Sequence, residues 1–444
     1  AGCVEPNAVF EGPARTLYPV RRGTQLDADR RVRAGASAMG FGGINTHVVL
    51  ASGDPPDARL APTLSERALL ASAQDGEIFV LGAATLDELR RQAQALARVA
   101  ADVARSELAD LSASLVAGLP AAPTWRAAWL ASTPQQLVRL LERTSTLEQC
   151  AGPDVWLGRA GTQPRIGFLC PGQGSQALGM GAHLLARDPE LDARARRLAD
   201  VAAAAGCPGL LDALYVGADA AVAPDELADA RARLRATELA QPAICLVSLV
   251  WAARLRELGL VPSVVAGHSL GELTAFALAG VIDEATLMRL AVVRGRAMAG
   301  AGTRAGGMLS LAASVDEARA LCRECVGYVE IANINAARQV VVAGELAALD
   351  QLLEHARVRG IAARRLAVSH GFHSQLVADA ASWLRDAAPV PERLHAPKAT
   401  LLSSLLPAPI EVEGFDLREH VAAHVRSPLD FVGLLERVAA RCDM

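Results

Sequence analysis

The residue best placed to do chemistry is Ser269, which stands between two glycines in the segment AGHSLGE (266–272). An apolar strand is expected over Val261–Ala266 and a helix over Glu272–Ala279, so the serine lies on the turn between them. A tight strand-to-helix turn presents a nucleophilic oxygen at the end of a sheet. Gly267 and Gly271 suit such a turn because a Cβ at either position would meet the crossing backbone.

A serine nucleophile needs a base, and the chain has nine histidines. The segment HGFHS (370–374), with His370 and His373, stands apart because it follows an expected strand, and strand-end loops collect catalytic groups in α/β proteins. Five other histidines have no accompanying motif, and we expect them to be packed or solvated: His183, His355, His395, His420 and His424.

The segment PGQGSQ (171–176) directly follows another expected strand, Ile166–Cys170. It is not a phosphate-binding loop, because no Gly-Lys-Ser/Thr follows, and its spacing also fails the dinucleotide-binding pattern. We expect its backbone N–H groups to point into a cleft. There they would stabilise the oxyanion of a tetrahedral intermediate, each donor being worth about 3 to 4 kcal/mol of the barrier.

Arg294, in the segment VVRGR (292–296), is expected on the helix after the one that Ser269 opens. A planar guanidinium binds a carboxylate through two parallel hydrogen bonds, with a direction that lysine lacks. An arginine beside the nucleophile would therefore select a dicarboxylic acyl group. In an arginine-rich chain the alternative is an ordinary surface arginine.

Two further compact units are expected along the chain. The first is a small α/β unit built from strands 78–81, 126–131 and 155–158 and helices 86–103, 108–117 and 134–143, with a Pro/Asp/Ala-rich linker at 54–63 before it. The second is a βαββαβ module within 304–368, whose order predicts a ferredoxin-like fold. Its strands are expected at 308–312, 328–334, 339–343 and 362–368 and its helices at 315–325 and 346–358, forming one wall of a cleft over Ser269.

The composition excludes several classes of function. A formal net charge of −4 argues against nucleic acid or an anionic membrane as the main partner. Eight cysteines show no disulfide framework, and the pair Cys322 and Cys325 has no second pair to complete a zinc site. With no secretory leader or apolar run of about 18 residues, we expect a cytoplasmic protein that needs no metal or redox cofactor.

The three segments around Gln173, Ser269 and His373 occur in the order and spacing of the malonyl-CoA:acyl-carrier-protein transacylases. From about Arg165 onward the chain resembles the acyltransferase domain of a type I polyketide synthase. The segment 34–50 resembles the C-terminal end of a ketosynthase, with His47 in its G-x-N-x-H-V motif. The sequence of residues 39–47 is similar to that of iterative, enediyne-type synthases. His47 is expected to do no chemistry here, because the nucleophile of such an enzyme would lie upstream.

This resemblance implies an organisation and a fold. Residues 1–55 correspond to a ketosynthase remnant, 56–160 to the adaptor between ketosynthase and acyltransferase, and 161–444 to the acyltransferase. The fold implied is α/β, with an α/β-hydrolase-like large subdomain (161–303 and 369–444) and an inserted ferredoxin-like small subdomain (304–368).

The resemblance also implies site roles. Ser269 is the nucleophile, His373 the base, and Arg294 the residue that binds the malonyl carboxylate. Backbone N–H groups of Gln173 and Leu270 form the oxyanion hole, and a backbone carbonyl near Ser427 orients the histidine. The implied substrate-binding positions also include Phe372, Gln241, His268 and Asn335.

Phe372 and Leu270 both match malonyl-selective members of the family, which often have an aliphatic residue after the serine. At position 372 the phenyl ring fills the space that an α-methyl group needs. Two positions depart from the family pattern: Gly371 replaces alanine, and Cys170 replaces phenylalanine.

The activity implied is ping-pong transfer of malonyl from coenzyme A to the phosphopantetheine thiol of an acyl carrier protein. A ketosynthase of the same polypeptide would then use the extender unit. Two alternatives remain open. The first is a serine esterase or thioesterase with the same strand-to-helix turn (a nucleophile elbow), which would have no need of Arg294. The second is a catalytically silent docking fragment.

Overall fold

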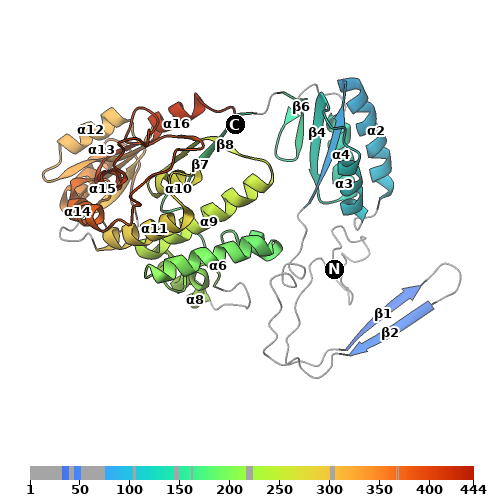
Figure 1. Ribbon diagram of the computed structural model, residues 1–444, viewed down its shortest axis with the longest axis horizontal. Coiled ribbons are helices and arrows are strands. Elements are labelled where there is room, and N and C mark those ends of the chain that lie inside the picture. The colour runs from blue at the N-terminus through green and yellow to red at the C-terminus, as the bar shows by residue number, and fades with distance from the viewer. Residues whose placement is uncertain are drawn as a thin grey trace. The chain divides into compact units, whose positions relative to one another are not determined.

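The computed structural model describes residues 33–39, 45–51, 76–103, 107–144, 150–161, 164–216, 224–300, 306–366, 368 and 370–444 (Figure 1). The chain divides into two compact units, Ala1–Gln163 and Pro164–Met444. The predicted linker at 54–63 and the boundary at 55/56 lie outside the described residues.

The first unit contains a hairpin and a small α/β sheet. In the hairpin, β1 (Arg33–Met39) pairs antiparallel with β2 (Asn45–Ala51), which places His47 opposite Ser37. The sheet has the order β3-β4-β6-β5, with every neighbouring pair antiparallel. Its strands are β3 (Glu77–Ala83), β4 (Trp125–Ala131), β5 (Cys150–Ala151) and β6 (Val155–Arg159).

Three helices complete that sheet: α2 (Leu86–Asp102), α3 (Leu108–Ala117) and α4 (Pro134–Thr144). Alternate strand residues face them, so Phe79 and Trp129 are buried, and the Trp129 indole N–H donates to Thr144 at 3.1 Å. The elements predicted here are confirmed to within two residues, because alternation and helical periodicity are both local patterns.

The second unit has a three-stranded parallel sheet at its centre, in the order β13-β8-β7. These strands are β7 (Ile166–Cys170), β8 (Pro262–Gly267) and β13 (Thr400–Leu401). Helices surround it, and α9 packs against α11 and α6 in Figure 1. The helices are α5 (Ala182–Arg187), α6 (Pro189–Ala204), α7 (Leu210–Leu214), α8 (Pro224–Arg235), α9 (Thr237–Glu257), α10 (Leu270–Leu278), α11 (Glu284–Ala299), α14 (Ala378–Ala387), α15 (Leu417–Arg426) and α16 (Phe431–Ala439), with a 3₁₀ turn at Gln375–Val377.

Helix α9 is, among the described residues, the one helix long and apolar enough to cross a membrane by length and composition. Twelve of its residues are buried, including Gln241, Ile244 and Leu246. Burial inside the protein accounts for its apolar character, since a core helix passes the same test.

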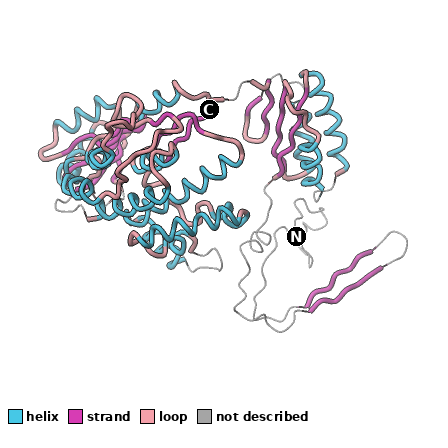
Figure 2. The backbone as a smooth tube through the Cα atoms, in the orientation of Figure 1, coloured by secondary structure: helices cyan, strands magenta, loops and turns pink. Residues whose placement is uncertain are grey.

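The predicted ferredoxin-like module is confirmed, with one addition. Its strands take the order β12-β9-β11-β10, each pair antiparallel, and a fifth strand from the end of the chain, β14 (Leu429–Asp430), joins β10 in parallel. In Figure 2 the strands of both units are magenta and the helices that accompany them are cyan. The last strand is shorter than predicted, because only three residues of β12 pair with β9. The module comprises β9 (Gly306–Leu311), α12 (Val315–Arg323), β10 (Val329–Ala336), β11 (Gln339–Glu345), α13 (Leu346–Val358) and β12 (Ala363–Arg365).

The two faces of this sheet have different partners. Leu309, Leu311 and Val342 form a core with α12 and α13. On the other face, Met308 and Val341 join the core of the main sheet and line a cavity. The module therefore forms one wall of a cleft over Ser269.

Candidate active site

Ser269 occupies a strained turn between β8 and α10, with φ 50° and ψ −115°. A Cβ on Gly267 would lie 2.0 Å from the carbonyl carbon of Gly271, and one on Gly271 would lie 2.1 Å from the carbonyl oxygen of Cys170. Both contacts are impossible for a larger residue, so the glycines are required by close backbone approach. The predicted strand-turn-helix geometry is confirmed, and helix α10 begins two residues earlier than expected, at Leu270.

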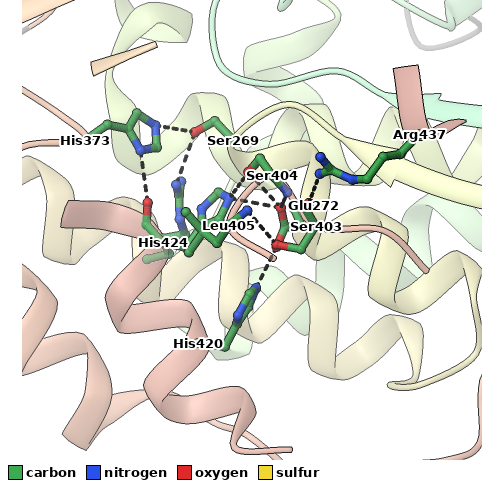
Figure 3. Close-up of polar contacts among 10 residues, drawn as sticks. Ser269, Glu272, His373, Ser403, Ser404, Leu405, His420, His424 and Arg437 are labelled. Carbon is green, nitrogen blue, oxygen red and sulfur yellow. Dashed lines mark hydrogen bonds and ion pairs between the residues drawn. The ribbon is translucent and has the colours of Figure 1, made fainter. Parts of the chain in front are cut away.

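His373 lies beside the serine, with its Nε2 at 2.9 Å from Ser269 Oγ (Figure 3). Both side chains are buried. The other ring nitrogen, Nδ1, lies 2.9 Å from the backbone carbonyl oxygen of His424, which accepts only if Nδ1 carries the proton. Nε2 is then the acceptor that faces the hydroxyl.

The resemblance implied a backbone carbonyl near Ser427, and the carbonyl that His373 meets is that of His424, three residues earlier in the chain. Ser427 is the C-cap of α15, and its N–H donates to the carbonyl of Ala423. His424 lies in the last turn of that helix, where carbonyl groups have no intrahelical donor and remain free to accept.

The pKa of His373 lies well below its ordinary value, because burial disfavours the imidazolium and the nearby His424 and Arg294 add to that effect. His373 is therefore neutral at physiological pH. A neutral imidazole with a free Nε2 lone pair is the form that accepts a proton from serine.

Arg294, on α11, is 1% exposed and reaches Ser269. Its Nη1 donates to Gln241 Oε1 at 2.9 Å, and its Nη2 donates to Ser269 Oγ at 3.3 Å. Burial lowers its pKa to about 10, which leaves the guanidinium charged at neutral pH. None of the ion pairs among the described residues includes Arg294, so its charge is available to an anionic ligand.

Gln241 is fully buried and holds the arginine rather than facing the cavity. Its Nε2 lies 3.5 Å from Gln173 Oε1, and Gln173 Nε2 in turn donates to Thr237 at 3.1 Å. This chain of amides fixes both the guanidinium and the glutamine of the 171–176 loop.

The cavity above Ser269 has a volume of about 820 Å³. Its described lining includes Gln173, His268, Asn335, Phe372 and His373, and His268 Nε2 lies 2.9 Å from Asn335 Oδ1. The structure thus brings Gln173, His268, Asn335, Phe372 and His373 together around Ser269 at one cavity. Arg294, Leu270 and Gln241 are not among its described lining residues: Arg294 lies against Ser269 Oγ, and Gln241 lies against Arg294.

Two backbone N–H groups are free for an oxyanion. Within the described part of the chain, neither Leu270 nor Gln173 donates its N–H to another group. Leu270 is the first residue of α10, so its N–H has no intrahelical acceptor and the positive end of the helix dipole lies behind it.

Glu272 is a buried carboxylate, 1% exposed, for which the sequence predicts no role. His420 Nε2 lies 2.6 Å from its Oε1, and His424 Nε2 lies 3.2 Å from its Oε2 (Figure 3). Ser403 Oγ donates to Glu272 Oε1 at 2.7 Å, and Ser404 donates its backbone N–H and its hydroxyl to Oε2 at 3.0 and 3.1 Å.

Burial alone would raise the pKa of Glu272, but His424 and His420 hold it well below its usual range. Burial lowers the pKa of His424, against the attraction of Glu272. The carboxylate is thus ionised and the His424 ring neutral at pH 7. From the sequence, His420 and His424 are expected only to be packed or solvated; their spacing of four residues, which puts both rings on one helix face, is the one sequence signal that could have indicated a shared partner.

The family is decided by a match over most of the second unit. A family model described as acyl transferase domain matches residues 167–441. The chain belongs to the acyl transferase domain family. Its similarity to homologues and to solved structures identifies it as an acyltransferase domain of a type I polyketide synthase. It has the two-subdomain fold of such domains.

Two curated relatives illustrate the match. A type I phenolphthiocerol synthesis polyketide synthase of Mycobacterium marinum is 33% identical over 415 residues, covering 91% of this chain and 18% of that protein. Erythronolide synthase of Saccharopolyspora erythraea is 31% identical over 350 residues, covering 79% and 10%. The chain therefore spans about a fifth or less of the length of these relatives.

Solved structures agree. The acyltransferase domain of an iterative polyketide synthase in enediyne biosynthesis is 31% identical with a TM-score of 0.62, covering 82% of this chain and 83% of that one. An acyl-carrier-protein S-malonyltransferase from Burkholderia pseudomallei is 30% identical with a TM-score of 0.54, covering 62% and 86%. This acyltransferase domain is thus related to malonyl transacylases.

Proposed function

We propose that this domain transfers a malonyl group from malonyl-CoA, through an ester on Ser269, to the phosphopantetheine thiol of an acyl carrier protein. The observation that carries the proposal is Arg294, a buried guanidinium that donates to the serine oxygen at 3.3 Å and has no carboxylate partner in the described structure. The carboxylate of a malonyl ester on Ser269 would supply that partner. The malonyl group would serve as an extender unit for a ketosynthase of the same cytoplasmic polypeptide.

In the first half-reaction, Ser269 Oγ attacks the thioester carbonyl carbon and gives its proton to His373 Nε2. The N–H groups of Leu270 and Gln173 stabilise the oxyanion of the tetrahedral intermediate. The C–S bond then breaks, the coenzyme A sulfur takes the proton from His373, and the malonyl ester remains on Ser269 with its carboxylate on Arg294.

In the second half-reaction, His373 accepts the proton of the carrier thiol as its sulfur attacks the ester carbonyl. The tetrahedral intermediate collapses with cleavage of the bond to Ser269 Oγ, which regains its proton from His373. Because the carbonyl of His424 keeps Nδ1 protonated, the same Nε2 accepts and returns the proton in both halves.

Phe372 supports malonyl over methylmalonyl as the group transferred. Its side chain is 5% exposed and lines the cavity beside His373, in the position expected to meet an α-methyl group. One methyl group is worth about 1 to 3 kcal/mol, so we expect a preference of about ten- to a hundredfold in competition between the two thioesters. Equal incorporation would remove this part of the proposal.

The proposal is tested by the mass of the intact protein after incubation with malonyl-CoA. We expect one malonyl group on the wild-type chain and none on Ser269→Ala, with transfer to an added phosphopantetheinyl carrier protein discharging the ester. Labelling of the Ser269→Ala protein would refute the proposal. Discharge by water at the same rate with and without carrier would make the domain a hydrolase.

A further inference from the structure

The charged side chains that line the cavity above Ser269 are all positive among the described residues. The described residues around it include four arginines and no aspartate or glutamate, although the whole chain carries a formal net charge of −4. These arginines come from two different parts of the second unit. Arg231 and Arg235 lie on α8 of the large subdomain, whereas Arg364 and Arg365 lie on β12 of the ferredoxin-like module.

Strand register separates the two arginines of β12. Arg365 pairs with Leu309, whose side chain faces the helices of the module, and Arg365 forms an ion pair with Asp350 on α13. Arg364 pairs with Ser310 and so projects from the opposite face, the one that carries Met308 and Val341 into the cavity. The charge of Arg365 is therefore compensated, and that of Arg364 faces the cleft.

Helix geometry makes a similar distinction on α8. Arg231 and Arg235 are one turn apart and line the cavity together with the buried Leu234. Arg233 is also exposed but is not among the residues that line the cavity. In the described structure, none of Arg231, Arg235 and Arg364 has a carboxylate partner.

The geometry points to a polyanion site: Arg231, Arg235 and Arg364, which we name the rim arginines, bind the phosphate groups of the coenzyme A donor. This inference rests on the proposed function. The acyl end of the donor must reach Ser269 at the base of the cavity, so its other end, with a diphosphate and a 3′-phosphate, extends toward the outer walls. Guanidinium groups pair with phosphate oxygens through two parallel hydrogen bonds.

The donor is a better fit than the carrier arm. A carrier-bound phosphopantetheine has a single phosphodiester, whereas coenzyme A has three phosphoryl groups that can meet arginines from both parts. The rim arginines would thus contribute to capture of the donor, and once coenzyme A leaves they would be vacated for the carrier.

The test compares two donors, malonyl-CoA and malonyl-pantetheine, which carries the same thioester without phosphates. The variants are Arg231→Gln/Arg235→Gln and Arg364→Gln, with Arg233→Gln as the matched control from the same helix. We expect KM for malonyl-CoA to rise about fivefold per rim arginine, as for a partly exposed ion pair of roughly 1 kcal/mol. The ratio of kcat/KM for malonyl-CoA to kcat/KM for malonyl-pantetheine should fall by the same factors in the variants. Added salt should lower this ratio more in the wild type than in the variants.

Arg233→Gln is expected to behave as wild type. An unchanged preference in the rim variants, or an equal loss in the control, would overturn the inference. Slower discharge to the carrier with unchanged acylation would also overturn it, since the phosphate bound would then be the carrier's. The proposed function fails separately, because in that case malonyl-CoA would not label even the wild-type serine. Thermal unfolding measured on each variant identifies any that lose activity by unfolding.

Discussion

At the scale of single residues, the proposed function assigns the choice of acyl group to Arg294. It is buried, charged and held by Gln241, so its fork is preorganised for a carboxylate. We expect Arg294→Met to lower kcat/KM for malonyl-CoA by about two orders of magnitude, the loss of a charge-assisted bidentate pair of roughly 3 kcal/mol. Acetyl-CoA should lose far less, and steady-state kinetics with both thioesters measures the difference.

Arg294→Lys is the matched control for that prediction, because it keeps the charge and loses the fork. It should retain part of the malonyl activity. Since replacing a buried charge with an apolar side chain is often neutral for stability, Arg294→Met should unfold at a similar urea concentration. Equal losses with malonyl and acetyl donors would instead mean that Arg294 serves the serine and not the carboxylate.

The burial of His373 predicts how the rate of Ser269 acylation depends on pH. Because burial, His424 and Arg294 depress the pKa of His373 below its ordinary value of 6.5, its neutral form persists as the solution becomes mildly acidic. The rate of Ser269 acylation should therefore stay constant as pH falls through 6.5 and decline only at lower pH, where the imidazole is protonated. Rapid-quench acylation across that range measures the midpoint. A midpoint at or above 6.5 would show that the base is not the buried imidazole described here.

At the scale of elements, Glu272 connects α10, the helix that Ser269 precedes, to α15. The carboxylate is on α10, three residues after Ser269, and its partners include His420 and His424 on α15. The same α15 supplies the carbonyl that orients His373. The position of the His373 ring relative to Ser269 thus depends on how α10 and α15 are held together by one buried carboxylate.

Glu272→Gln should destabilise the domain by about 2 to 4 kcal/mol, because the donors around the carboxylate lose a charged acceptor in a buried site. The pKa of Glu272 is held below its ordinary value of 4.5, so its stabilisation is fully present above that pH and is lost as pH falls through the lower folded value. Urea unfolding of wild type and variant at several pH values measures both effects. Glu354→Gln, which breaks the exposed pair with Arg357, is the control and should cause no resolvable change.

Some secondary-structure elements can be predicted from the local sequence, and others cannot. Helices α2 and α3 and the ferredoxin-like strands follow from local periodicity, and the elbow follows from two glycines. The fifth strand, β14, has only two residues and joins β10 from nearly a hundred positions away, so no local pattern reveals it. The Glu272 network and the choice of the His424 carbonyl over Ser427 also depend on where α15 packs, which is a tertiary fact.

At the scale of the whole molecule, all of the site belongs to the unit from Pro164 to Met444. That unit has its own core, distinct from the one built around Phe79 and Trp129. Its two ends are joined: Arg165 forms an ion pair with Asp443 at 2.8 Å, and the N–H of Gly167 donates to the carbonyl of Met444 at 2.7 Å. Strand β7 and the last residues of the chain therefore close the unit together.

We expect a fragment 164–444 to fold cooperatively and to be acylated by malonyl-CoA at a rate within about twofold of the 444-residue chain, because a unit with its own core can fold alone. A fragment 171–444 is the matched control: it retains Ser269, His373 and Arg294 but lacks β7 and the ion pair of Arg165, which exposes the edge of β8. It should unfold at markedly lower urea concentration or not fold at all. If fragment 164–444 were unfolded, or folded and inert, the first unit would have to be counted as part of the catalytic domain.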